Sequence, residues 1–200
     1  MAIEAGANML GLVSAMPSGP GVIEETLIAE IADQLPPGVT SVLLTSLQEP
    51  ELIIEQQRRC RVNALQLVDS LPTGNHQRLR AALPGIALIQ VIHVSGPESL
   101  AEAIEVAPSV NAILLDSGNP TLPVKELGGT GRIHDWQISR AIREAVSVPV
   151  YLAGGLNPDN ITLAIEQVGP FGLDICSGVR TNGMLDEQKL ARLFSRVSHI

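Results

Sequence analysis

Four short segments hold the residues whose types and spacing could do chemistry. The apolar run 112–115 ends on a carboxylic acid, Asp116, and the glycine-rich segment Gly128-Gly-Thr-Gly131 follows it. Two further turns, Gly154-Gly155 and Ser177-Gly178, each come after an apolar run. Glycine-rich turns expose backbone N–H groups that can bind phosphate. The segments therefore indicate one functional carboxyl group beside a phosphate-binding surface, although Asp116 could also serve only as a turn former.

Apolar runs of strand length alternate with segments of helix length, and these elements must position the four segments. We expect strands at residues 8–14, 39–46, 63–68, 86–94, 112–116, 148–153 and 172–176. We expect helices at 24–34, 50–59, 74–83, 97–106, 136–145, 158–168 and 186–197, after a helix remnant at 1–7 that Gly6 terminates. Near-continuous apolar strands separated by helices predict a parallel sheet that is buried on both faces.

The count of these units favours a closed barrel. We expect one domain over residues 1–200: an α/β fold of the (βα)8 TIM-barrel type whose first strand is missing from this chain, because the helix remnant implies a strand before Met1. An open doubly wound sheet is the alternative, but no Gly-x-Gly-x-x-Gly follows the first strand. In a barrel, functional groups lie at the carboxyl ends of the strands, where the four segments fall.

Composition limits the partners. The chain has 13 Lys and Arg against 21 Asp and Glu, a net charge of −8, which argues against a nucleic-acid or anionic-membrane partner. Its two cysteines, Cys60 and Cys176, form neither a disulfide framework nor a zinc pattern, so we expect the reduced cytoplasm and no metal. No signal peptide or membrane span is evident.

Local signals also predict where two helices begin and which side chains share a strand face. Asn157 is expected to cap a helix that starts at Pro158, and Asp135 to cap the helix that starts at Trp136. Alternation along the last strand would place Asp174 and Cys176 on one face. We expect His93, Cys60 and the arginines around Cys60 to be structural rather than catalytic.

Four motifs resemble the phosphoribosylanthranilate isomerase family, whose members are (βα)8 barrels of tryptophan biosynthesis that use no cofactor. In chain order, they are Leu114-Leu-Asp-Ser117, Gly128-Gly-Thr-Gly-x-x-x-Asp-Trp136, Leu152-Ala-Gly-Gly-Leu-Asn-Pro-Asp-Asn160 and Asp174-x-x-Ser-Gly-Val179. The resemblance implies an Amadori rearrangement, in which a phosphoribosylamine becomes an aminoketose. That reaction needs an acid at the ring oxygen and a base at the C2 proton.

The resemblance also assigns roles to residues. It implies that Asp116 is the general acid and that the partner is a small phosphosugar. The implied phosphate-binding residues are Gly129, Gly154, Gly155, Ser177 and Gly178, and the implied further substrate-site residues are Gln66 and Asp174.

Three departures from the family pattern leave the substrate open. The family's opening strand, Lys-Ile-Cys-Gly, carries its general-base cysteine and is absent here, and Pro20 stands near its usual arginine. Its Gln-Leu-His-Gly strand reads Gln66-Leu-Val68-Asp69 here. The chain could therefore be this isomerase with an upstream first strand, an isomerase of another phosphoribosylamine-like phosphosugar, or a non-catalytic phospho-ligand binder. Cys176 is a further candidate for the base.

Overall fold

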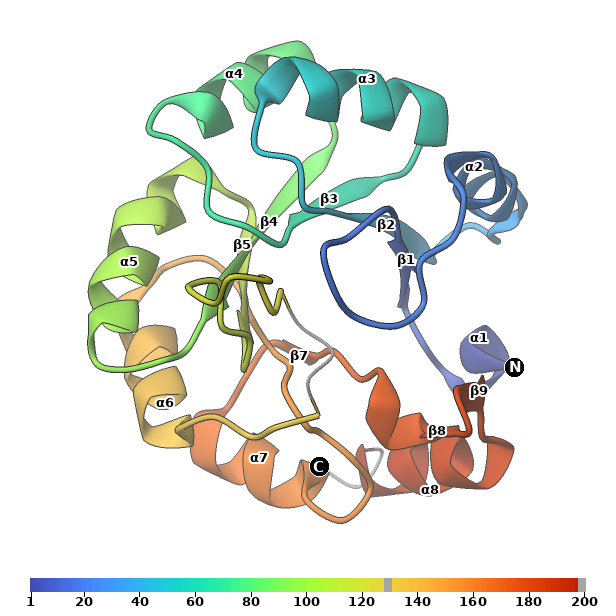
Figure 1. Cartoon of the computed structure of the whole chain (residues 1–200). Coiled ribbons are helices and arrows are strands. Elements are labelled where there is room, and N and C mark those ends of the chain that lie inside the picture. Colours follow the sequence, from blue (N-terminus) through green and yellow to red (C-terminus); the bar gives the residue numbers. More distant parts are fainter. Residues whose placement is uncertain (128–130, 198–200) are drawn as a thin grey trace.

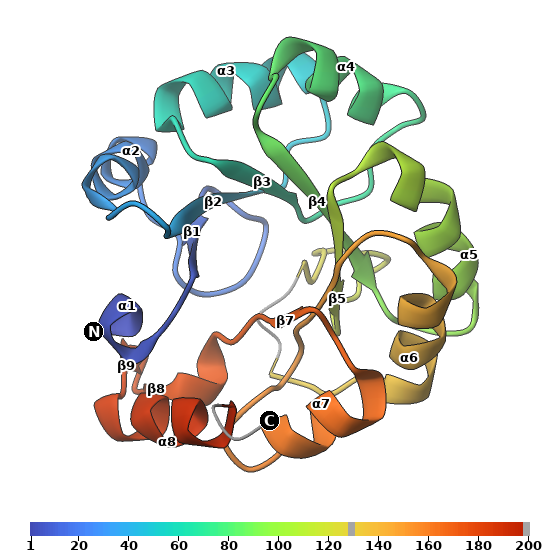
Figure 2. The same ribbon diagram turned by 180° about the vertical axis from the view of Figure 1, so that it is seen from behind.

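A computed structural model describes residues 1–127 and 131–197. Within these ranges, seven parallel strands form one curved sheet in chain order, and the helices lie outside it (Figures 1 and 2). The strands are β1 Met9–Val13, β2 Thr40–Thr45, β3 Ala64–Leu67, β4 Ala87–His93, β5 Ala112–Asp116, β6 Val150–Leu152 and β7 Gly172–Leu173. The predicted α/β barrel type, with strictly parallel strands, is confirmed at this level. β1 and β7 are the two ends of the described sheet.

The helices follow the strands as predicted. They are α1 Ala2–Ala5, α2 Glu25–Gln34, α3 Pro50–Cys60, α4 Asn75–Ala82, α5 Glu98–Val106, α6 Trp136–Ala145, α7 Ile161–Val168 and α8 Glu187–Val197, with single 3₁₀ turns at η1 Ala107–Ser109 and η2 Ser177–Val179. Gly6 ends α1 with a left-handed φ of 115°, and the Asp135 side chain caps α6 by accepting from the Gln137 N–H at 2.8 Å. Both predicted caps are therefore confirmed.

Two apolar clusters cover the two faces of the sheet. Leu65 and Leu67 of β3 pack with the helices in the larger cluster, whereas Ala64 and Val68 belong to a smaller cluster on the inner face. Because side chains alternate along a strand, Gln66 shares the inner face with Ala64 and Val68. The same alternation along β5 places Asp116 on the inner face with Ala112 and Leu114.

Two local expectations were wrong, and one further element was not expected. Asn157 does not cap a helix at Pro158, because α7 begins only at Ile161; its Oδ1 instead accepts from the Asp159 N–H at 2.8 Å, which closes a turn. β7 stops at Leu173 instead of continuing to Cys176, because the chain turns into η2. A small antiparallel hairpin, β8 Arg180–Thr181 with β9 Met184–Leu185, was not predicted.

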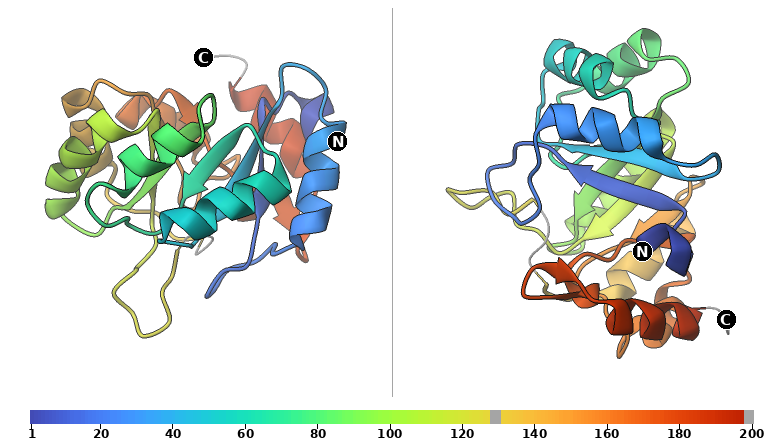
Figure 3. Two further views of the ribbon diagram at one scale, coloured as in Figure 1. Left: turned by 90° about the horizontal axis from the view of Figure 1, so that it is seen from above. Right: turned by 90° about the vertical axis from the view of Figure 1, so that its right-hand side faces the viewer.

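The segment after β5 extends further than the other loops at the carboxyl edge of the strands (Figure 3). Asn119 and Glu126 exchange two backbone hydrogen bonds of 2.7 and 3.0 Å, so the segment forms a hairpin-like excursion.

Within the described ranges, no helix has the length and apolar character needed to cross a membrane.

Candidate active site

Asp116 is placed by the end of β5. It is the last residue of that strand, is paired in register with His93 of β4, and is only 8% exposed. Its Oδ1 accepts a hydrogen bond from the Ser117 backbone N–H at 2.7 Å. The strand therefore directs the carboxyl group to the inner side of the carboxyl edge, where a barrel of this type places its functional groups.

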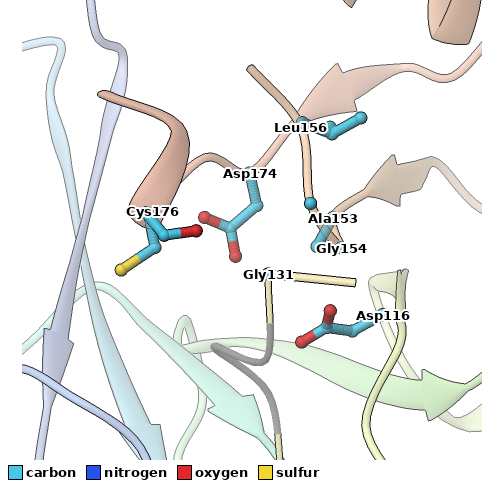
Figure 4. A pocket seen from close by; sticks show the side chains of 9 residues that line it. Asp116, Gly131, Ala153, Gly154, Leu156, Asp174 and Cys176 are labelled. Carbon is cyan, nitrogen blue, oxygen red and sulfur yellow. The ribbon is translucent and has the colours of Figure 1, made fainter. Parts of the chain in front are cut away.

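A pocket at this edge brings together residues from the ends of β5, β6 and β7 (Figure 4). Five residues predicted from the sequence line it, namely Asp116, Gly154, Gly155, Asp174 and Ser177, and they are joined by Gly131, Ala153, Leu156 and Cys176. Figure 4 shows the carboxyl groups of Asp116 and Asp174 directed toward the same space, with the Cys176 sulfur directed away from both. The pocket therefore combines two acids with glycine turns.

The turns at this pocket touch one another through their glycines. A Cβ at Gly178 would lie 1.9 Å from the Leu156 carbonyl oxygen, and a Cβ at Gly155 would lie 2.8 Å from the Gly131 carbonyl oxygen. Gly154 and Gly155 also have left-handed φ angles of 83° and 63°, which side chains rarely adopt. These positions need glycine both for conformation and for close approach. Gly129 lies outside the described residues.

Burial and a like charge change the acidity of Asp174. Desolvation, followed by the nearby charge of Asp116, raises the pKa of Asp174 from 3.8 to about 6. Its side chain is half-buried. A carboxyl group with this pKa can hold or release a proton near neutral pH, so the pair offers acid–base chemistry beside the glycine turns.

His134 is a titratable neighbour that sequence reasoning missed. Its Nε2 lies 2.8 Å from the Ser139 hydroxyl, while its buried Nδ1 has no hydrogen-bond partner among the described residues. Burial lowers the pKa of His134 against the opposing charges of Asp116 and Asp135. A Cβ at Gly154 would lie 3.0 Å from Nδ1, so the ring packs on the glycine turn after β6. A lone histidine in a loop gave no sequence signal for this position.

Three other candidates are not among the residues that line the pocket. Gln66 is buried on β3 and is not among the residues that line the pocket. His93 donates from Nε2 to the Val68 carbonyl oxygen at 2.9 Å, a contact that ties β4 to β3. Cys60 is buried on α3. Within the described ranges, no group of three or more His, Cys, Asp or Glu is placed to hold a metal ion.

The fold and site define a class: a parallel α/β barrel with paired carboxyl groups beside glycine turns suited to an anion. Residues 2–196 match the family model described as N-(5'phosphoribosyl)anthranilate (PRA) isomerase. The chain is 35% identical over 201 residues to N-(5'-phosphoribosyl)anthranilate isomerase 2 of Methanosarcina mazei, covering 100% of this chain and 88% of the relative.

Solved structures agree with this match. The phosphoribosylanthranilate isomerase of Thermotoga maritima superimposes with a TM-score of 0.83 at 28% identity, over 100% of this chain and 92% of that one. Another isomerase structure, in complex with reduced 1-(o-carboxyphenylamino)-1-deoxyribulose 5-phosphate, has a TM-score of 0.81 at 26% identity, over 100% and 91%. The chain therefore belongs to the N-(5'-phosphoribosyl)anthranilate isomerase family, aldose–ketose isomerases of tryptophan biosynthesis, which confirms the resemblance in its motifs.

Proposed function

We propose that this chain isomerises N-(5'-phosphoribosyl)anthranilate to the corresponding 1-amino-1-deoxyketose phosphate. Membership of the family over residues 2–196 is the observation that carries this proposal. The reaction opens the sugar ring to a Schiff base, removes the C2 proton and returns a proton to C1. It therefore needs proton donors and acceptors, which carboxyl groups supply.

Asp116 would act as the general acid toward the ring oxygen. Its place at the end of β5, on the inner face of the sheet and at the wall of the pocket, supports this role. Asp174 would serve as a second substrate-site acid, because its carboxyl group faces the same space (Figure 4). Gln66, on the inner face of β3, would contact the substrate from the other side of the mouth.

The two turns after β6 and β7 would bind the phosphate. Gly154, Gly155, Ser177 and Gly178 supply backbone N–H groups, and the turns carrying them are in contact. Gly129 is proposed to join them, although it lies outside the described residues. This surface carries no lysine or arginine of its own between residues 153 and 179, so backbone amides would do the binding.

The general base is the remaining requirement. We propose that an eighth parallel strand, inserted between β1 and β7, supplies a cysteine as the base. Two facts support it: β1 and β7 are the ends of the described sheet, and the chain covers 88% of its Methanosarcina relative. Cys176 is the less favoured base, because its sulfur is directed away from the two acids (Figure 4).

Sequencing the DNA upstream of Met1 tests whether an additional strand supplies the general base. An in-frame segment encoding an apolar strand with a cysteine is expected, and a longer protein that includes it should be active. A stop codon close upstream would reject this source of the base. Replacing Cys176 with Ser in whichever form is active distinguishes the two cysteines, since only a base at position 176 would make this variant inactive.

One assay separates the proposed function from its alternatives. Phosphoribosylanthranilate and phosphoribosylamines without the anthranilate group are offered in parallel, and turnover of the first alone is expected. Preference for another amine would favour a different phosphosugar, which Pro20 near the family's arginine position makes the second candidate. Binding without turnover would favour a phospho-ligand binder. The two unpaired cysteines support a cytoplasmic location for this activity.

A further inference from the structure

We infer that Lys125 determines substrate specificity by binding the carboxylate of the anthranilate group, and that Asp69 holds it in position. This inference rests on the proposed function and adds to it a residue that the motifs do not include. The ligand in the related isomerase structure has two anionic ends, a 5-phosphate and a carboxyphenylamino group. The glycine turns suit the phosphate, so the carboxylate needs a second partner at the other end of the substrate.

Lys125 is carried across the mouth by the segment after β5. The Ser18 hydroxyl, in the segment after β1, donates to the Lys125 carbonyl oxygen at 2.6 Å. Two views show the segments after β1 and β5 side by side beyond the strand ends (Figure 3). The tip that holds Lys125 therefore belongs to the β1–β3 side of the mouth, although its strand is β5.

The Lys125 ammonium is fixed by an ion pair with Asp69. Asp69 lies just after β3 and its side chain is 6% exposed, while the Lys125 side chain is 39% exposed. The second oxygen of Asp69 accepts from the Ser70 N–H at 2.9 Å. An ammonium has three donor hydrogens. One of them can donate to Asp69, while another, on the exposed side of Lys125, can donate to a second carboxylate.

The order of the strands suits a substrate with anionic groups at both ends. The phosphate turns follow β6 and β7, and Asp69 follows β3. From β3 to β6 there are three strand spacings of about 4.8 Å each along the curved sheet. A substrate anchored by its phosphate at β6 and β7 would cross Asp116 at β5 and present its other end toward β3.

The sequence offers few other cations for this task. The segments that follow the seven strands are 14–24, 46–49, 68–74, 94–97, 117–135, 153–160 and 174–186, and they contain only Lys125, Arg132 and Arg180. Arg132 belongs to the β6 side of the mouth, because its carbonyl oxygen would lie 2.9 Å from a Cβ at Gly155, and it pairs with Glu126. Arg180 donates to the Gly183 carbonyl oxygen at 2.8 Å within its own hairpin beyond β7. Lys125 is therefore the cation that contacts the β3 side of the mouth.

A partly exposed apolar side chain near Lys125, that of Met16, suits the aromatic ring. Met16 packs against buried Val68, just after β3, and buried Leu127 in one apolar cluster. These three residues come from the segments that bring Asp69, Lys125 and Ser18 together. A benzene ring bearing an ortho carboxylate needs an apolar contact for the ring and a cation at its edge, and this part of the mouth has both.

The test compares two ligands that differ by one carboxyl group. One is reduced 1-(o-carboxyphenylamino)-1-deoxyribulose 5-phosphate, and the other is the same compound with an unsubstituted phenyl ring. Calorimetry on the wild-type chain should show that the carboxylated ligand binds about tenfold more tightly, the usual size of one charge-assisted contact. Lys125→Met should remove this preference, and Lys125→Arg should keep most of it.

Lys189→Met is the matched control, because the chain contains only these two lysines and Lys189 contacts the Arg180 carbonyl oxygen on the outer hairpin. It should keep the wild-type preference. A preference that persists in Lys125→Met overturns the inference while leaving the proposed function intact. If the wild-type chain binds neither ligand, the proposed function fails first, and the inference fails with it.

Amine methylation of the wild-type chain tests the contact without any substitution. The carboxylated ligand should slow modification of Lys125 more than the unsubstituted ligand does at equal occupancy, with Lys189 as the internal reference. Equal rates at Lys125 with the two ligands would overturn the inference even if Lys125→Met does not fold.

Discussion

The backbone of Gly178 lies against the carbonyl group of Leu156 so closely that a Cβ at position 178 would be 1.9 Å from the carbonyl oxygen. Gly178 follows β7 and Leu156 follows β6, so this contact joins the two turns proposed to bind phosphate. The obstacle is backbone, which cannot rotate away as a side-chain end can. The contact therefore fixes the relative position of the two sets of N–H groups.

We predict that Gly178→Ala separates these turns. Forced overpacking of this kind should lower the free energy of unfolding by about 1–3 kcal/mol and weaken binding of a phosphate-bearing ligand. Urea denaturation and calorimetry measure the two effects. Gly11→Ala is the control, because its Cβ would meet only the flexible end of Leu44 at 3.2 Å. Unchanged ligand binding in Gly178→Ala would contradict the proposed phosphate site.

Asp116→Asn should separate chemistry from binding. Loss of a general acid should lower kcat by about 10²–10⁴-fold. Affinity for reduced 1-(o-carboxyphenylamino)-1-deoxyribulose 5-phosphate should change little, because the Asn amide has nearly the same shape as the Asp carboxyl group. The measurements are steady-state turnover in the active form of the enzyme and calorimetry with the analogue. Asp33→Asn, at an exposed position on α2, should match the wild type. Equal loss of turnover and binding would indicate a structural role for Asp116.

The raised pKa of Asp174 predicts a specific pH dependence of stability. Since its pKa is about 6 in the folded chain and 3.8 ordinarily, the native state binds a proton that the unfolded chain has already released between these values. The contribution of Asp174 to stability is thus present below about pH 4 and is lost as the pH rises through about 6.

Asp174→Asn removes this titration. Its free energy of unfolding, measured in urea from pH 4 to pH 7, should fall less with rising pH than that of the wild type, because the other titrating groups are common to both proteins. Parallel curves for the two proteins over this range would show that the Asp174 pKa is not raised.

The two cysteines should differ in reactivity. Cys60 is buried on α3, and desolvation raises the pKa of its thiol to about 11, whereas Cys176 is exposed at the pocket. Iodoacetamide at pH 8 should therefore modify Cys176 in the folded chain and Cys60 only after unfolding, as peptide mass analysis would show. A phosphate-bearing ligand should slow modification at Cys176. Modification of Cys60 at a comparable rate in the folded chain would contradict its burial.

Local signals predicted most elements of the fold. Residues 136–145 were predicted as a helix with Asp135 as its cap, and α6 spans Trp136–Ala145 with that cap formed, because capping depends on neighbours in the chain. Asn157 and Pro158 were misread, since the same two residue types also form the turn that is seen there. The contact between Gly178 and Leu156 could not be predicted, because neither residue indicates how closely two loops will pack.

The sequence by itself determined the succession of strands and helices, the buried character of the sheet and the placement of Asp116 at a strand end, because periodicity and capping are local properties. The tertiary structure decided which strand ends share a pocket. It buried Asp174 near Asp116, so that desolvation and then the neighbouring charge raise the pKa of Asp174. It also brought Lys125, in the segment after β5, to Asp69 after β3. Such contacts depend on how the strands curve and how far a loop extends, and residues distant in sequence set both.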